Sequence, residues 1–138
     1  MANLMPDFLS CGFLRPFFWR LAGANISDIS NSIIRKNVFI EHPKNLKVGA
    51  KLHINRDSYL DASDALNIGD NVTISLGCKI LTISHQGINH EKDIIKSTTL
   101  KSNCIVYAGA TILPGSIVEK YVIVAAGSVL MGNTVAGG

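Results

Sequence analysis

Aliphatic residues return every six positions through the second half of this 138-residue chain, and this period limits what the chain can fold into. Amphipathic helices repeat near 3.6 residues and half-buried strands near 2, so neither explains a period of six. Short strands joined by turns do explain it, with one aliphatic side chain of each strand pointing inward. The recurring positions are Leu100, Val106, Ile112, Val118, Val124 and Leu130.

The first half repeats in longer coils, because Ile34, Ile54 and Ile74 are spaced by 20 residues. Two units of six residues and one of eight make up such a coil, which predicts three strands per coil and a triangular prism. We expect the two extra residues near Lys47 and Asn67, as a bulge at one corner. Each coil can bury its aliphatic residues only against its neighbours, so the predicted fold is an all-β parallel solenoid.

Composition excludes several classes of protein. Hydrophobic residues make up 47% and charged residues 17%, which is ample for a buried core, and the net charge of +3 comes without a dense basic run. Such a charge predicts no nucleic-acid groove. The three cysteines form no C-x-x-C pair, so we expect no disulfide framework and a cytoplasmic location.

The stretch from Phe8 to Leu21 is apolar but contains Arg15, Pro16 and Arg20. It is too short to span a membrane, and a signal peptide would carry its positive charges before the apolar run. We expect residues 1–25 to form an amphipathic segment that covers the end of the domain. The alternative is a surface that touches the inner face of a membrane.

The six-residue period stops after Ile80 and resumes at Leu100. The polar residues between them cannot lie inside the prism, so residues 26–138 are predicted to form one solenoid with an extruded loop at 84–99. A loop on a rigid scaffold is a common place for a functional site. This loop contains His85, His90 and Glu91.

The repeated pattern of an aliphatic residue, a glycine and a small residue, as in IGDNVT and VAAGSV, resembles the hexapeptide-repeat acyltransferase family. The resemblance extends over residues 26–135 and implies a left-handed parallel β-helix. The run GDNVTISLGCKILTISHQ at 69–86 is similar to that of sugar O-acetyltransferases of the galactoside and maltose acetyltransferase type. This similarity implies acetyl-CoA as the donor, a sugar hydroxyl as the acceptor and a homotrimer.

The resemblance also implies roles for particular residues. His85 takes the place of the general base, whose imidazole removes the hydroxyl proton and typically speeds the reaction roughly 100- to 10,000-fold. Asn55 and Asp61 match the asparagine and the carboxylate of the acceptor site. Either could instead be an ordinary turn residue, and Asp61 could also orient His85. We expect His90 and Glu91 to flank the acceptor.

The same resemblance assigns the pantetheine arm of acetyl-CoA to a strip of small residues. They are Ala108, Gly109, Ala126, Gly127 and Ser128. No metal is expected. The chain departs from the family at Tyr107, where glycine is usual, and at Met131 and Gly132, where many members have a Thr-Lys pair. These departures, with a chain that stops at Gly138, favour a truncated chain or a weakened CoA pocket.

Repeat arithmetic separates the two halves of the predicted site. The residue one 20-residue coil before His85 is Ala65 and not Asn55. Asn55 therefore belongs to another face of the prism. A six-residue face spans roughly 15–20 Å at the rise of a strand, too far for both side chains to reach one substrate within a chain. We therefore expect the site at the interface between neighbouring subunits of a homotrimer.

Two other functions stay open. The spacing of His85 and His90 resembles part of the zinc site of γ-class carbonic anhydrases, which need a third histidine; the nearest candidate is His53. The other alternative is an inactive scaffold that binds a partner. For the enzyme, the lead-in LRPFFWRLAGA at 14–24 resembles acetyltransferases of bacterial polysaccharide biosynthesis, which implies a polysaccharide precursor as the acceptor.

Overall fold

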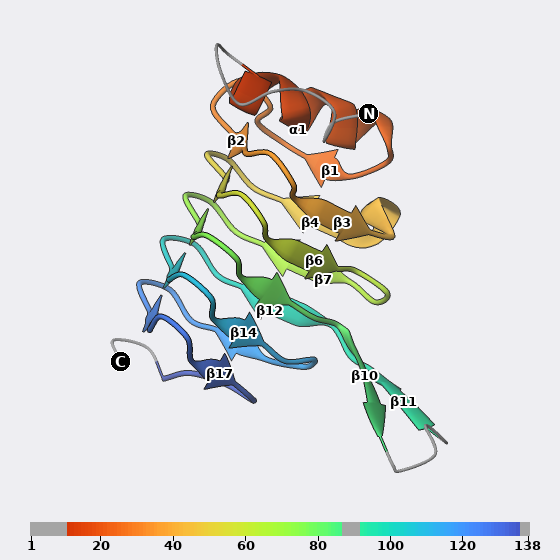
Figure 1. Cartoon of the computed structure of the whole chain (residues 1–138), viewed down its shortest axis with the longest axis vertical. Helices are drawn as coiled ribbons and strands as arrows, with labels where there is room; N and C mark the ends of the chain where they lie inside the picture. Colours follow the sequence, from red (N-terminus) through yellow and green to blue (C-terminus); the bar gives the residue numbers. More distant parts are fainter. Residues whose placement is uncertain (1–10, 87–91, 136–138) are drawn as a thin grey trace.

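The computed structural model describes residues 11–86 and 92–135. Within these ranges one α-helix, α1 (Cys11–Leu21), lies across the end of a stack of short strands (Figure 1). The stacked strands form three five-stranded parallel sheets, here called faces A, B and C, which the chain visits in that order in every coil. The predicted all-β solenoid with three strands per coil is confirmed.

The strands that form each face come from successive coils. Face A consists of β1 (Asn25–Ile26), β4 (Leu46–Val48), β7 (Leu66–Ile68), β12 (Thr98–Leu100) and β15 (Ile117–Val118). Face B consists of β2 (Ile33–Ile34), β5 (His53–Ile54), β8 (Thr73–Ile74), β13 (Ile105–Val106) and β16 (Ile123–Val124). Face C consists of β3 (Phe39–Glu41), β6 (Tyr59–Asp61), β9 (Lys79–Ile80), β14 (Thr111–Ile112) and β17 (Val129–Leu130). The coils are interrupted by a 3-10 helix, η2 (Pro43–Asn45), and by an antiparallel hairpin of β10 (Ile83–Gln86) and β11 (Lys92–Ile95).

Inward side chains stack on their counterparts in the next coil. On face B, Ile34 is in register with Ile54, and Ile54 is in register with Ile74. All three are fully buried. Burying an aliphatic side chain of this size contributes about 1.5–3 kcal/mol relative to leaving it exposed. The stability of each coil therefore depends on the register of the coils beside it.

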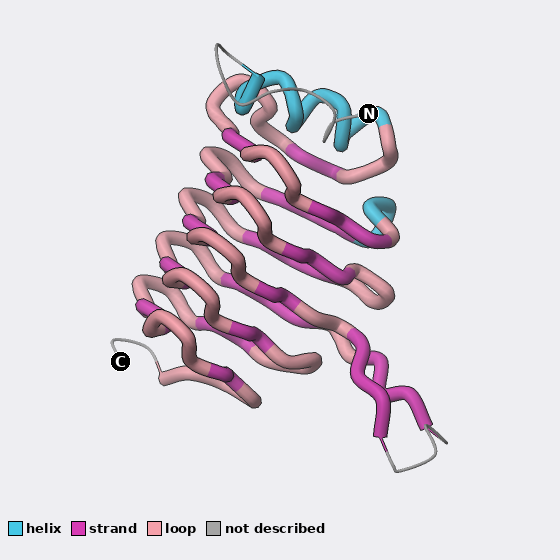
Figure 2. Tube along the Cα trace, in the orientation of Figure 1, coloured by secondary structure: helices cyan, strands magenta, loops and turns pink. Residues whose placement is uncertain are grey.

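The extra residues of the early coils lie elsewhere than predicted. Lys47 and Asn67 are in the middle of β4 and β7 and point away from the core, because the residues on either side of each are buried. This alternation leaves no room for a bulge there. The extra residues lie instead between faces C and A, in η2 and in the turn that follows Asp61. This edge of the prism, called the CA corner, is also where the hairpin leaves the solenoid (Figure 2).

The helix α1 covers the first coil. Gly12 lies so close to Ile33 that an added Cβ would come within 3.2 Å of the isoleucine side chain. Arg15 is fully buried, and its Nη1 donates a hydrogen bond of 3.4 Å to the carbonyl oxygen of Ile34. Within the described ranges, no helix has the length and apolar character that crossing a bilayer requires.

Left-handed residues recur at the edge between faces A and B. Asn71, Asn103 and Tyr121 have φ values of 53°, 63° and 63°. The amide group of Asn71 donates a hydrogen bond of 3.0 Å to Oδ1 of Asn103 in the next coil. Glycine adopts this conformation at low cost and asparagine does so occasionally, whereas a tyrosine is strained there.

Replacing Tyr121 by asparagine is expected to raise the free energy of unfolding by about 1 kcal/mol, because asparagine tolerates the left-handed backbone better. Urea denaturation measures the change. The control is Tyr121→Ala, which removes the same exposed ring without relieving the backbone and should bring no gain. An equal increase in the free energy of unfolding for the two variants would show that the exposed ring, and not the left-handed backbone, destabilises the wild type.

Candidate functional site

The hairpin of β10 and β11 projects from the CA corner (Figure 1). Its register places His85 directly opposite Asp93. The predicted loop at 84–99 extends too far at its C-terminal end, because Thr98 is buried and already forms part of β12. His85 therefore lies on an ordered strand that stands away from the solenoid rather than in an irregular loop.

His85 and Asp93 form a close pair across this hairpin. Nδ1 of His85 lies 2.6 Å from Oδ1 of Asp93, and the side chains are 57% and 47% exposed. A carboxylate that accepts a hydrogen bond from Nδ1–H places the lone pair of a neutral imidazole on Nε2. A histidine that acts as a general base is typically oriented in this way by a neighbouring side chain, here Asp93. The sequence alone did not indicate Asp93 as the partner of His85, because the pairing depends on a hairpin register that the repeat does not contain.

Asp61 is the most deeply buried of the described residues predicted for the site, with 1% of its surface exposed. Its Oδ2 accepts hydrogen bonds from the amide and hydroxyl of Thr82, at 3.0 and 2.8 Å, and from the amide of Ile83 at 3.0 Å. Its Oδ1 accepts hydrogen bonds from the hydroxyl and amide of Ser63 at 2.6 and 3.2 Å. Asp61 is therefore not a solvated turn residue: it connects the turn after β6 to the start of the hairpin.

These hydrogen bonds control the ionisation of Asp61. Burial alone would raise the pKa of this carboxyl, but the hydrogen bonds from Ser63 and Thr82 outweigh burial and lower the pKa below its ordinary value of 3.8. The carboxylate is thus charged at neutral pH. A buried charge holds the chain two residues before His85, which supports a positioning role for Asp61.

Asp61→Asn is expected to lower the free energy of unfolding by about 2–4 kcal/mol, because an amide nitrogen would replace an oxygen that accepts hydrogen bonds from buried donors. The loss depends on pH. Since the folded-state pKa is lowered, the stabilisation is complete above pH 3.8 and is lost as the pH falls through the folded-state pKa. Denaturation measured at pH 7 and at pH 3 should therefore give a smaller difference between variant and wild type at pH 3.

The matched control is Asp64→Asn in the same turn. Oδ1 of Asp64 accepts a hydrogen bond of 2.7 Å from the adjacent amide of Ala65, and the side chain is only half-buried. Its replacement should change stability by less than about 1 kcal/mol. Equal losses for the two variants at both pH values would contradict the role assigned to Asp61.

The edge between faces B and C, called the BC corner, holds the other predicted site residues that the structure describes. Asn55 lies in the turn after β5, Gly109 in the turn after β13 and Gly127 in the turn after β16. The amides of Gly109 and Gly127 each donate a hydrogen bond of 2.9 Å to a carbonyl oxygen of the preceding coil. Asn55 and the predicted donor strip therefore stack along one edge of the solenoid.

The turns of this strip are open to solvent. Gly109 and Gly127 have φ values of +71° and +69°, and an added Cβ at either would meet no atom within 4 Å. Ala108 and Ala126 are exposed beside them. The hydroxyl of Ser128 donates a hydrogen bond of 2.6 Å to a carbonyl oxygen of its own turn. An extended ligand can approach the backbone at Gly109 and Gly127 directly, and it passes the exposed ring of Tyr107 in the first of these turns.

Asn55 and His85 stand at different edges of the prism. Asn55 is at the BC corner, where its Oδ1 accepts a hydrogen bond of 2.8 Å from the amide of Arg56. His85 lies on the arm that leaves the CA corner after β9. A face about 15–20 Å wide at the rise of a strand separates the two edges. The geometry of a single chain therefore keeps the two halves of the predicted site apart.

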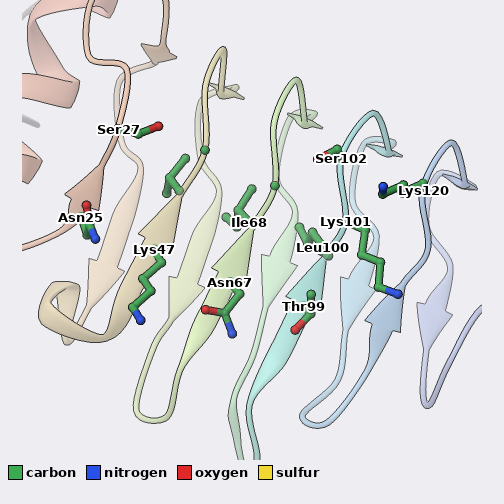
Figure 3. Close-up of a pocket in the computed structure, with 13 residues that line it drawn as sticks. Asn25, Ser27, Lys47, Asn67, Ile68, Thr99, Leu100, Lys101, Ser102 and Lys120 are labelled. Carbon is green, nitrogen blue, oxygen red and sulfur yellow. The ribbon is translucent and has the colours of Figure 1, made fainter.

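Surface hollows differ in their relation to His85. A hollow of about 400 Å³ opens beside the hairpin, between Ser84 on the arm and Gly115 at the CA corner. A shallow groove of about 440 Å³ runs along face A, where Lys47 and Asn67 line it (Figure 3). None of the predicted site residues lines this groove. Ser84 and Ile94, which face each other across the hairpin, line the hollow beside it, whereas the next pair, His85 and Asp93, does not.

The zinc hypothesis gains no ligand set from the described residues. His90 and Glu91 lie outside them, and in ranges 11–86 and 92–135 no three His, Cys, Asp or Glu side chains are grouped closely enough to hold a metal ion. His53 lies on face B, and its Nε2 is buried without a hydrogen-bond partner among the described residues. Burial and the charge of Arg35 both lower the pKa of His53.

No protein-family model and no curated protein matches the sequence. Solved structures do match the fold. A hexapeptide-repeat acetyltransferase of Vibrio cholerae in complex with acetyl-CoA has a TM-score of 0.82 at 19% identity, over 96% of this chain and 73% of that chain. AntD, an N-acyltransferase of Bacillus cereus in complex with dTDP and 3-hydroxybutyryl-CoA, has a TM-score of 0.70 at 16% identity, over 94% of this chain and 81% of its own. The chain therefore has the parallel β-solenoid fold of solved hexapeptide-repeat acetyltransferases.

Proposed function

We propose that this chain is an acetyl-CoA-dependent O-acetyltransferase that acts in the cytoplasm on a sugar hydroxyl of a bacterial surface-polysaccharide precursor. The observation that carries the proposal is the 2.6 Å pair of His85 and Asp93 on the projecting hairpin. The fold shared with an acetyltransferase that binds acetyl-CoA supports the donor. The resemblance of the run at 69–86 to sugar acetyltransferases supports the acceptor.

The pair of His85 and Asp93 can perform the proton transfers of this reaction. Asp93 holds the Nδ1 proton, so Nε2 accepts the proton of the acceptor hydroxyl as its oxygen attacks the thioester carbonyl carbon. The tetrahedral intermediate collapses by breaking the carbon–sulfur bond. The CoA thiolate then takes the proton from Nε2, which regenerates the neutral imidazole. Asp93 stabilises the imidazolium that exists between the two transfers.

The donor fits the BC corner. The open turns at Gly109 and Gly127, flanked by Ala108 and Ala126, suit an extended pantetheine arm that runs parallel to the solenoid axis. Main-chain amides near this arm would also stabilise the oxyanion of the tetrahedral intermediate. Asn55 lies on the same edge, and this supports its assignment to the acceptor.

A homotrimer would bring these two halves together. Because one chain keeps His85 and Asn55 at different edges, a complete site needs the hairpin of one subunit against the BC corner of the next. A cyclic arrangement repeats this heterologous contact at every interface and closes the ring. The site would then form only in the oligomer.

His85→Ala is expected to lower kcat roughly 100- to 10,000-fold, because the variant loses the imidazole that is proposed to take the hydroxyl proton. Asp93→Asn should lower kcat at least about tenfold by favouring the wrong imidazole tautomer. The assay is thiol release from acetyl-CoA with a panel of neutral sugars and amino sugars.

His42→Asn, which changes an exposed histidine in the turn before η2, is the control and should retain the wild-type rate. Thiol release with amino sugars alone would show that the chain transfers the acetyl group to an amine and would contradict the proposed O-acetylation. Absence of both thiol release and acetyl-CoA binding would favour an inactive scaffold. Activity that requires bound zinc would favour the metal-dependent alternative.

Mixing two inactive variants tests the shared site. Subunits that carry His85→Ala and subunits that carry Asn55→Ala, unfolded and refolded together, should recover about one quarter of the wild-type activity, because one interface in four then combines both intact residues. Each variant refolded alone should stay inactive. No recovery in trimers shown by mass to contain both variants would contradict a site built from two subunits.

A further inference from the structure

One face of α1 is apolar and exposed. Phe13, Leu14, Phe17 and Leu21 expose between 47% and 69% of their surfaces. The opposite face, with Gly12, Arg15 and Pro16, is buried against the first coil. The helix lies across the end of the solenoid, so its outer face is directed away from the stack of coils (Figure 1). Contiguous apolar surface of this kind marks an interaction site when polar residues surround it.

The residues around this apolar face are basic. The helix has no acidic residue, and Arg20 in its last turn is exposed. Exposed Lys44 lies beside Gly23 just after the helix, and Arg35 lies beside Gly12 at its start. Positive charge thus lies at both ends of the helix. This combination of charge and apolar surface matches a helix that lies in the interface of an anionic bilayer.

The same charges argue against a second copy of the chain as the occupant. A twofold contact through this face would bring Arg20 and Lys44 of one copy close to the same residues of the other. Such like charges repel when desolvated. Spanning the bilayer is also excluded for α1, because its 11 residues are too few to cross a hydrocarbon core.

We infer that α1 binds the surface of an anionic membrane and lies flat in it. Phe13, Phe17 and Leu21 insert at the boundary of the acyl chains, and Arg20 and Lys44 contact the lipid phosphates. This inference does not rest on the proposed enzymatic function, because membrane binding uses none of the site residues. It would place the solenoid with its first coil toward the bilayer and its hairpin directed away from the bilayer (Figure 1).

Vesicle co-sedimentation of the full chain tests this inference, with phosphatidylglycerol–phosphatidylcholine vesicles compared with phosphatidylcholine alone. The wild type should bind the anionic vesicles at least tenfold more tightly, and binding should weaken as salt rises. The double variant Phe13→Ser/Phe17→Ser should lose at least tenfold in affinity. Arg20→Gln should weaken binding to anionic vesicles while leaving the weak binding to neutral vesicles unchanged.

The matched control is Phe39→Ser on β3, a phenylalanine that is 55% exposed but lies outside α1. It should bind vesicles like the wild type, and circular dichroism should show that all variants are folded. Equal loss in the Phe39 variant, or wild-type binding in the double variant, would overturn the inference. A smaller oligomer for the double variant in sedimentation velocity, without vesicles, would instead show that α1 contacts another copy and would also overturn it.

Discussion

Stacking in register along the three faces is the constraint on which the rest of this structure depends. Each inward residue, such as Ile54, must lie directly over its counterparts in the coils on either side, here Ile34 and Ile74. A strand that gained one residue would turn its aliphatic side chains outward. Additional residues can therefore enter the chain only at the edges of the prism. In the described coils they enter at the CA corner, as η2, as the turn after Asp61 and as the hairpin, and in the first coil also between β1 and β2, at the edge between faces A and B.

This constraint also bears on how a projecting arm can hold the proposed general base, His85. A hairpin that leaves a rigid edge would be free to pivot unless its base were fixed. The buried carboxylate of Asp61 fixes it through hydrogen bonds to Thr82 and Ile83. Register across the hairpin then sets Asp93 against His85. The stacked core residues thus fix the CA corner, the CA corner fixes the base of the hairpin, and the hairpin fixes the imidazole of His85.

Much of the fold could be predicted from the sequence, because a solenoid repeats its core residues at a fixed period. The spacing of Ile34, Ile54 and Ile74 indicated one face of the prism, and the break after Ile80 indicated the arm. The position of the extra residues was wrong, because spacing counts residues between core positions but does not say where between them the chain turns. Lys47 was predicted to belong to a bulge, but it is the outward-pointing residue in the middle of β4.

The site was harder to predict than the fold, because its contacts do not repeat. His85 stood out by its place after the last regular strand, but its partner Asp93 follows from hairpin pairing alone. Asp61 was predicted to be a carboxylate of the site, whereas its partners Ser63 and Thr82, which belong to two different turns, could not be predicted from the repeat. The assignments of Asn55 and of the donor strip stay predictions. The structure adds that both lie at the BC corner.

A crystal structure of the oligomer with acetyl-CoA bound would test this account most directly. The account predicts the pantetheine arm along Gly109 and Gly127 of one subunit, with the thioester carbonyl within reach of Nε2 of His85 from the neighbouring subunit. A donor bound within a single chain, either in the hollow between Ser84 and Gly115 or in the groove on face A, would contradict it.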